Sequence, residues 1–260
     1  MSWLTKTLTS SIGKKLLMSL TGLFLCTFLI VHLVGNLQLF KHDGGYAFNA
    51  YAVFMTSNPL IKTVSYGLYT LILFHAFWGL YLESQNRKAR PTGYVVVKNS
   101  SSWASRNMAI LGTIILVYIA VHMADFWWEY HNGPLPYTQY VENLQTGVVT
   151  SERMPADYTQ AVKKVEFVDV ATQTKTTILK DLYEEVAEGF SSSLLLVVFY
   201  VLSMAVLGYH LAHGFQSAFQ TLGFNHPKYS PAIKFLGIWV FAILIPLGFA
   251  LMPLYFYFLK

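Results

Sequence analysis

The sequence predicts an all-α fold, an integral membrane bundle of five transmembrane helices with one long polar loop, and two observations support it. Hydrophobic residues make up 54% of the 260 residues, charged residues only 12%, and the mean hydropathy is +0.44. A soluble domain carries about 25% charged residues, so half of that charge is missing. In addition, five stretches without Asp, Glu, Lys or Arg are long enough to cross a bilayer, which takes about 20 residues.

These stretches follow one another along a single expected membrane domain, residues 1–260. They are Leu16–Phe40, Thr63–Leu82, Asn107–Ala124, Gly189–Pro227 and Phe235–Leu259. From them we expect spans at about 16–40, 63–86, 106–129, 190–221 and 232–258. The fourth stretch is too long for one crossing, so part of it should lie in the interface or in water. Two prolines should kink the fifth span, Pro246 and Pro253.

The Lys and Arg residues of the short loops predict the orientation, because cytoplasmic loops are enriched in them. One side carries Lys6, Lys14, Lys15, Arg87, Lys88, Arg90, Lys98, Arg106, Lys228 and Lys234, and the other carries Lys41, Lys62 and Lys260. This places the N-terminus in the cytoplasm and the C-terminus outside.

The long polar loop, about residues 130–189, should then lie on the outer face. Ten of the thirteen acidic residues lie between Glu129 and Glu188. The pattern of Val165, Phe167 and 168–170 suggests a short strand or hairpin. A solvated cap over the bundle is favoured over a partner-docking site.

Several classes of function are excluded. The single cysteine, Cys26, excludes disulfide frameworks, cysteine-ligated zinc, iron–sulfur clusters and covalently attached haem within this chain. There is no glycine-rich nucleotide-binding motif. The basic residues do not gather into a nucleic-acid face, although the net charge is +5.

Five of the eight histidines fall inside the expected spans, where an ionisable side chain is costly and usually functional. They are His32, His75, His122, His210 and His213. At about 1.5 Å per residue, His32 and His122 lie roughly 25 Å from the inner edge. His75 and His210 both lie roughly 17 Å from that edge. The depths predict two pairs, each drawn from alternate helices.

Glycines accompany the paired histidines. Gly22 and Gly112 each precede an outer histidine by ten residues, and Gly79 and Gly214 each follow an inner histidine by four. A glycine lets a large planar group approach the backbone, as an iron porphyrin held between two imidazoles requires. We therefore predict two b-type haems, which would make an electron path across the membrane.

Two other interpretations of these histidines stay open. Histidines can join helices as hydrogen-bonding groups, or they can form the proton relay of a transporter. Relays usually include buried carboxylates, whereas Glu83, Asp125 and Glu129 all lie at span ends. His213 could donate a hydrogen bond to a haem propionate or to a residue that binds the iron, or it could replace His210 as the iron ligand.

The chain resembles the two-haem cytochrome b membrane subunit of succinate:quinone oxidoreductases in its five-span, single-polypeptide form. The resemblance is carried by the run from Ser19 to His32, by His75-Ala-Phe, and by His210-x-x-x-Gly214-x8-Gly223. The last motif selects His210 over His213. The likeness covers all five spans but not the long outer loop, which is large for that family.

The resemblance implies the cofactors and partners. A flavoprotein (FAD) subunit and an iron–sulfur subunit would dock on the cytoplasmic face of the inner membrane of a bacterium and interconvert succinate and fumarate. This chain would hold no dicarboxylate site. Electrons would pass through the inner haem (His75, His210) and the outer haem (His32, His122) to or from a quinone, usually menaquinone. The assembled complex could dimerise.

Candidates for the quinone site lie near the outer haem histidines: Asp125, Asn36, His42 and Asp43. Solvated carboxylates at helix ends explain the two aspartates equally well. Some fumarate-reducing members carry a glutamate where this chain has Gly208, so we expect no carboxylate proton route there and lean towards succinate oxidation. The alternatives are the cytochrome b anchor of a hydrogenase or formate dehydrogenase, and a non-redox transporter or anchor.

Overall fold

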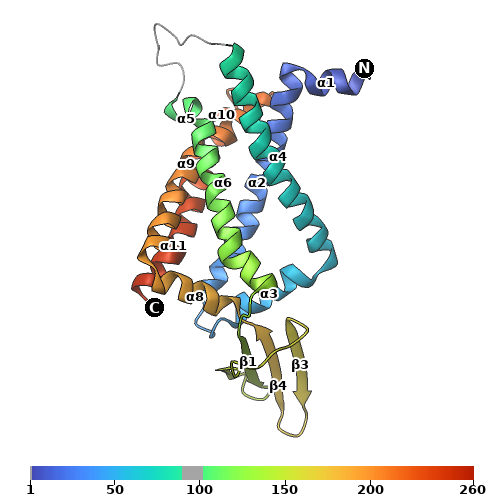
Figure 1. The fold of residues 1–260 in the computed structure, drawn as a ribbon, viewed down its shortest axis with the longest axis vertical. Helices are drawn as coiled ribbons and strands as arrows, with labels where there is room; N and C mark the ends of the chain where they lie inside the picture. The colour runs from blue at the N-terminus through green and yellow to red at the C-terminus, as the bar shows by residue number, and fades with distance from the viewer. Residues whose placement is uncertain (1, 90–101) are drawn as a thin grey trace. The chain divides into compact units, whose positions relative to one another are not determined.

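The structure, a computed structural model, describes residues 2–89 and 102–260, and 72% of it is helical (Figure 1). Five helices are long and apolar enough to cross a membrane. They are Ser11–Phe40, Pro59–Ala89, Met108–Asn132, Leu194–Thr221 and Ser230–Phe258. The prediction of five spans is confirmed, although most helices extend a few residues past the expected ends. Arg90 and Lys98, two residues used to predict the orientation, lie outside the described residues.

Helical segments make up the five spans, and shorter helices lie before and between them. They are α1 (Trp3–Thr9), α2 (Ser11–Asn36), η1 (Leu37–Phe40), α3 (Tyr46–Ser57), α4 (Pro59–Ala89), α5 (Trp103–Arg106), α6 (Met108–His122), η2 (Met123–Trp128), α7 (Glu129–Asn132), α8 (Leu182–Ser192), α9 (Leu194–Thr221), α10 (Ser230–Phe235), η3 (Leu236–Leu244) and α11 (Ile245–Phe258). The fourth charge-free stretch does not form one continuous helix, because the chain leaves helical geometry at Ser193. After Thr221 the chain turns at Gly223, which has a positive φ of 86°.

Two spans contain π-helical segments. In the third span, η2 follows directly after His122. In the fifth span, η3 ends at Leu244, and Ile245 and Pro246 follow directly. Since proline lacks a backbone N–H, the helix around it cannot form a regular set of hydrogen bonds. π-Helical turns occur frequently at functional sites, so η2 is a candidate functional segment.

The prediction of an all-α fold is wrong, because the polar loop folds into a four-stranded antiparallel sheet. Its strands are β1 (Tyr137–Asn143), β2 (Val149–Arg153), β3 (Lys164–Asp169) and β4 (Thr174–Lys180), in the order β2-β1-β4-β3. The strand or hairpin expected near residue 165 corresponds to β3 and its hairpin with β4. The central strands β1 and β4 are largely buried, and the edge strands β2 and β3 are largely exposed.

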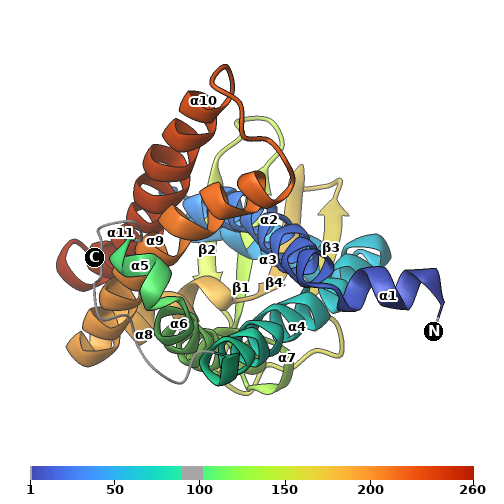
Figure 2. The ribbon, with the colours of Figure 1, turned by 90° about the horizontal axis from the view of Figure 1, so that it is seen from above.

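The chain divides into two compact units, and each is described by itself. Unit 1 comprises Met1–Leu33, Ser65–Ile119 and Val198–Leu251, and unit 2 comprises Val34–Val64, Ala120–Val197 and Met252–Lys260. In unit 1, α6 lies between α4 and α9 in both views (Figures 1 and 2). Its apolar core includes Cys26, Leu211, Phe215, Phe241 and Ile245.

In unit 2, α3 packs against β4 and against α8. Tyr130, Tyr140 and Leu179 are at most 2% exposed, and Asn49 of α3 is completely buried among them. The Asn49 side chain forms four hydrogen bonds, to Asp181, to Tyr140, and to the backbone amides of residues 182 and 183. Asp181 also accepts from the Glu184 amide (2.9 Å) and so caps the N-terminus of α8.

Candidate functional site

The structure brings the two inner histidines together in unit 1. His75 of α4 and His210 of α9 are half-buried, with ring centroids 6.3 Å apart and planes at 69°. A metal–imidazole nitrogen bond is about 2.0 Å, and the nitrogen lies about 1.2 Å from the ring centre. Two imidazoles on opposite sides of one metal ion therefore have centroids about 6 Å apart. The separation of this pair fits a shared metal ion.

A hydrogen bond from α2 orients one of the two rings. Thr21 Oγ1 donates its proton to the Leu17 carbonyl (2.9 Å), so at 3.0 Å it accepts from Nδ1–H of His75. This arrangement leaves the lone pair on Nε2, the nitrogen available to a metal. Thr21 is thus a positioning residue for His75 that the sequence pattern did not identify.

Glycines of two other helices approach the same rings. A Cβ atom at Gly22 would lie 3.3 Å from His75 Cε1, and one at Gly112 would lie 3.7 Å from His210 Cε1. The sequence spacing related these glycines to the outer histidines, whereas the structure places them against the inner ones. Gly79 instead faces Met18 (2.9 Å), and nothing lies within 4 Å of a Cβ at Gly214. The two rings therefore lie against the glycine positions of α2 and α6, where a larger side chain would crowd them.

His210 also has unused hydrogen-bonding capacity. Its Nδ1 atom is buried and makes no hydrogen bond within the described part of the chain. Leaving a buried polar atom unsatisfied costs about 1–3 kcal/mol, so such an atom usually meets a ligand or water. His213, three residues further along α9, is half-buried. The inner pair therefore fits a haem by its ring separation and by the tautomer of His75.

The two outer histidines have aromatic surroundings. His32 stacks on Phe28, with centroids 5.1 Å apart, and contacts Phe249 at 5.5 Å. His122 contacts Phe126 at 5.6 Å, at the start of η2. His32 belongs to unit 1 and His122 to unit 2, so their pairing stays a prediction.

One quinone-site candidate lines a pocket in unit 2. Asp125 of η2 lies with Glu129 and Glu185 in a pocket of about 440 Å³, whose other lining residues are Ala124, Phe126, Gly189 and Leu196. Burial raises the pKa of Glu185, and the nearby carboxylates of Glu129, Glu188 and Asp125 raise it further. Sequence reasoning missed Glu185, because only the packing of α8 near η2 brings it to this pocket.

The other three candidates lie near the start of unit 2. Asp43 caps α3, since its carboxylate accepts from the amides of Gly45 and Ala47 (both 3.1 Å). Helix capping explains this aspartate without a quinone. His42 is exposed, and Asn36 ends α2. Their suggested roles stay predictions.

A side chain cannot be placed at Gly208 without movement of the backbone. A Cβ there would lie 2.6 Å from the Ala242 carbonyl oxygen of η3. The close approach of α9 to η3 explains why this position holds glycine.

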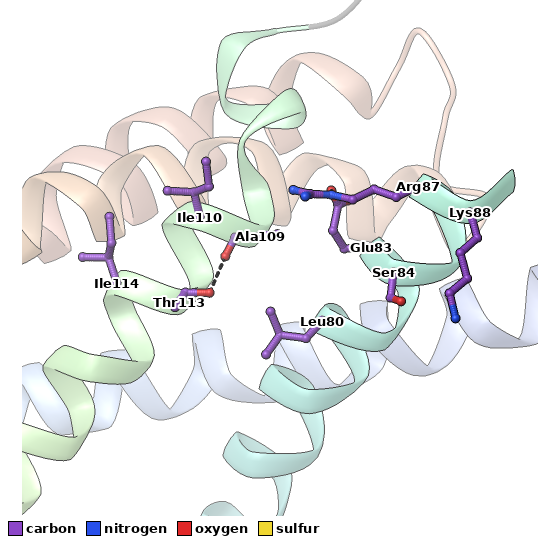
Figure 3. Close-up of a pocket in the computed structure, with 9 residues that line it drawn as sticks. All are labelled: Leu80, Glu83, Ser84, Arg87, Lys88, Ala109, Ile110, Thr113 and Ile114. Carbon is purple, nitrogen blue, oxygen red and sulfur yellow. Dashed lines mark hydrogen bonds and ion pairs between the residues drawn. The ribbon is translucent and has the colours of Figure 1, made fainter. Parts of the chain in front are cut away.

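A groove in unit 1 runs between the end of α4 and the start of α6 (Figure 3). Its volume is about 670 Å³, and its lining residues are Leu80, Glu83, Ser84, Arg87, Lys88, Ala109, Ile110, Thr113 and Ile114. Arg87 pairs with Glu83 at 2.7 Å, one helical turn away. The groove is apolar along α6 and charged along α4, as expected where a span ends.

Comparisons with known proteins add no relative. No protein-family model, no curated protein and no solved structure matches the chain.

Proposed function

We propose that this chain is the two-haem cytochrome b membrane subunit of a succinate:quinone oxidoreductase. The observation that supports this most directly is the pair His75 and His210, whose rings are 6.3 Å apart on two different spans. The Thr21 hydrogen bond and the glycines that approach the rings add to this support. The five apolar helices are consistent with a multi-pass membrane protein.

In this proposal His75 and His210 hold the inner haem, and His32 and His122 hold the outer one. Bound haem supplies reversible one-electron transfer. Thr21 would keep the proton on Nδ1 of His75, and Gly22 and Gly112 would leave room for the two imidazole rings. The aromatic neighbours of His32 limit the access of water.

The carboxylates of the unit 2 pocket would serve the quinone reaction, which exchanges two protons with water for every two electrons. Asp125 follows His122 by three residues, and Glu185 lies in the same pocket with a raised pKa. A carboxyl group with a raised pKa holds and releases a proton nearer neutral pH than an ordinary one. These two residues are the proposed proton carriers.

The partners and location belong to the same proposal. A flavoprotein subunit and an iron–sulfur subunit would bind the cytoplasmic side of a bacterial inner membrane, and menaquinone would react near the outer haem. Arg87 and Lys88, at the end of α4, are candidate contacts for the iron–sulfur subunit.

The test is a reduced-minus-oxidised spectrum with haem quantitation on the purified full-length chain. We expect two b-type haems per chain. His75→Ala and His210→Ala should each remove one haem, and the control His226→Ala, in the turn before α10, should retain both. His213→Ala should also retain both.

Other outcomes would reject all or part of the proposal. A haem-free protein in native membranes would replace it with the transporter or anchor interpretation. A single haem would mean that only one histidine pair binds iron. Two haems without a co-purifying flavoprotein would favour the hydrogenase or formate dehydrogenase anchor.

A further inference from the structure

A group of lysines in unit 2 has no part in the proposed electron path. The lysine cluster consists of Lys163 and Lys180, which lie near one aromatic ring, and of Lys62, whose charge acts on Lys163. Lys163 Nζ lies 4.3 Å from the centre of the Tyr130 ring, and Lys180 Nζ lies 5.7 Å from it. Lys180 is only 9% exposed, and its ammonium group donates to the Gly133 carbonyl at 3.0 Å. Two ammonium groups are thus held near one aromatic ring.

Among the described residues, no carboxylate forms an ion pair with the lysine cluster. Within residues 2–89 and 102–260, none of these three lysines has a carboxylate within 4.0 Å. Glu129 acts on Lys180 from a greater distance. Burial lowers the pKa of Lys163 to about 8, and repulsion from Lys180 and Lys62 contributes to this shift. Three ammonium groups beside one distant carboxylate favour an anionic ligand.

The lysine cluster lies at the level where two spans end. Lys62 is the fourth residue of the span Pro59–Ala89, and Tyr130 is the third residue from the end of the span Met108–Asn132. Beside Lys62, the side chains of Leu60 and Val64 are 73% and 54% exposed. Trp128 is 56% exposed. Basic residues next to exposed apolar and tryptophan side chains are typical of the interface between lipid headgroups and hydrocarbon.

We propose that Lys62, Lys163 and Lys180 bind the phosphate of an anionic phospholipid. Ammonium groups are strong hydrogen-bond donors to phosphate, and basic residues near the membrane surface attract anionic lipids. The exposed Leu60 and Val64 side chains provide apolar contact for the acyl chains. A soluble anion would use the ammonium groups but not this apolar surface, so the ligand is a lipid. The inference does not depend on haem or on the proposed electron path.

The experiment measures lipid binding to the purified full-length chain by native mass spectrometry from detergent micelles. The probes are phosphatidylglycerol and phosphatidylcholine with identical acyl chains. The test variant is Lys62→Gln/Lys163→Gln, because neither side chain is fully buried and Lys180 stays in place. The matched control is Lys164→Gln/Lys175→Gln, which removes the same charge from two lysines that pair with Glu166 on the sheet.

We expect the wild-type chain and the control to bind phosphatidylglycerol more tightly than phosphatidylcholine. The test variant should bind phosphatidylglycerol about 25-fold more weakly, since each lysine near a membrane surface contributes about fivefold. If the double variant does not fold, the single variant Lys62→Gln should still weaken binding about fivefold.

Three results would overturn the inference. Equal binding of the two lipids by the wild-type chain would mean that no anionic headgroup is selected. An equal loss of binding in the control would mean that only net charge matters. Displacement of phosphatidylglycerol by millimolar glycerol phosphate would show a site for soluble anions rather than for lipid.

Discussion

Replacing Asn49 by alanine should lower the free energy of unfolding of unit 2. The side chain is completely buried, and its Nδ2 group donates to Asp181 (2.8 Å) and to the hydroxyl of Tyr140 (3.2 Å). Its Oδ1 accepts from the amides of Leu182 and Tyr183 at 3.0 and 2.9 Å. Asn49→Ala removes all four hydrogen bonds and leaves two backbone amides without an acceptor.

The expected loss of stability follows from these bonds. A buried donor left without a partner costs about 1–3 kcal/mol, and two are left in this variant. The Asp181 carboxylate still accepts from Thr138 and from the Glu184 amide, so its own loss is small. We expect unit 2 to lose about 3–5 kcal/mol. Amides of β4 and α8 should then exchange about 150- to 4,000-fold faster with deuterium.

Hydrogen exchange followed by mass spectrometry of the full-length protein in detergent measures this effect directly. The matched control is Asn143→Ala. Asn143 Oδ1 also accepts from two backbone amides, those of Gln145 and Thr146, but in an exposed turn where water can replace it. Unchanged protection in Asn49→Ala would refute the argument, as would an equal effect of Asn143→Ala on the same peptides.

Three further predictions concern the spans and the lysine cluster. Gly208→Ala should lower stability by about 1–2 kcal/mol, because the new Cβ meets a backbone carbonyl at 2.6 Å, and thermal unfolding measures this. Thr21→Val, which rests on the proposed function, should release the haem held by His75 about tenfold faster to an apoprotein acceptor. Lys163 should titrate near pH 8, and Lys62→Gln should raise that pKa, as NMR of ¹³C-methylated lysines would report. Because the folded-state pKa lies below the ordinary value of 10.5, the charged Lys163 opposes folding below pH 8, and stability should rise with pH between about 8 and 10.5.

Each of these predictions has a control or a contrary outcome. Gly67→Ala meets nothing within 4 Å on α4, so it should be neutral or stabilising by up to about 1 kcal/mol. Thr27 donates only within its own helix, so Thr27→Val should leave haem release unchanged. A Lys163 pKa that is the same in the wild type and in Lys62→Gln would contradict the stated electrostatic cause.

The spans could be predicted from the sequence because their signal is local. Long runs without charge can be recognised without knowing what they pack against, and a constant rise per residue brings His75 and His210 to one depth. The sheet could not be predicted in the same way. Its central strand β1 pairs with β4, about forty residues away, and only that pairing buries Tyr140 against Leu179. Glu185 and Thr21 were missed for the same reason.

The hydrogen bond between Asn49 and Asp181 can form only after both residues have been synthesised. The two residues are 132 positions apart, and a ribosome adds about 5–20 residues per second. Asn49 is therefore synthesised roughly 7 to 26 seconds before its partner exists. During that interval α3 leaves the ribosome with an apolar face that nothing yet covers, while α4 and the third span are being inserted. The buried face of α3 therefore stays uncovered until the chain has been made as far as Asp181.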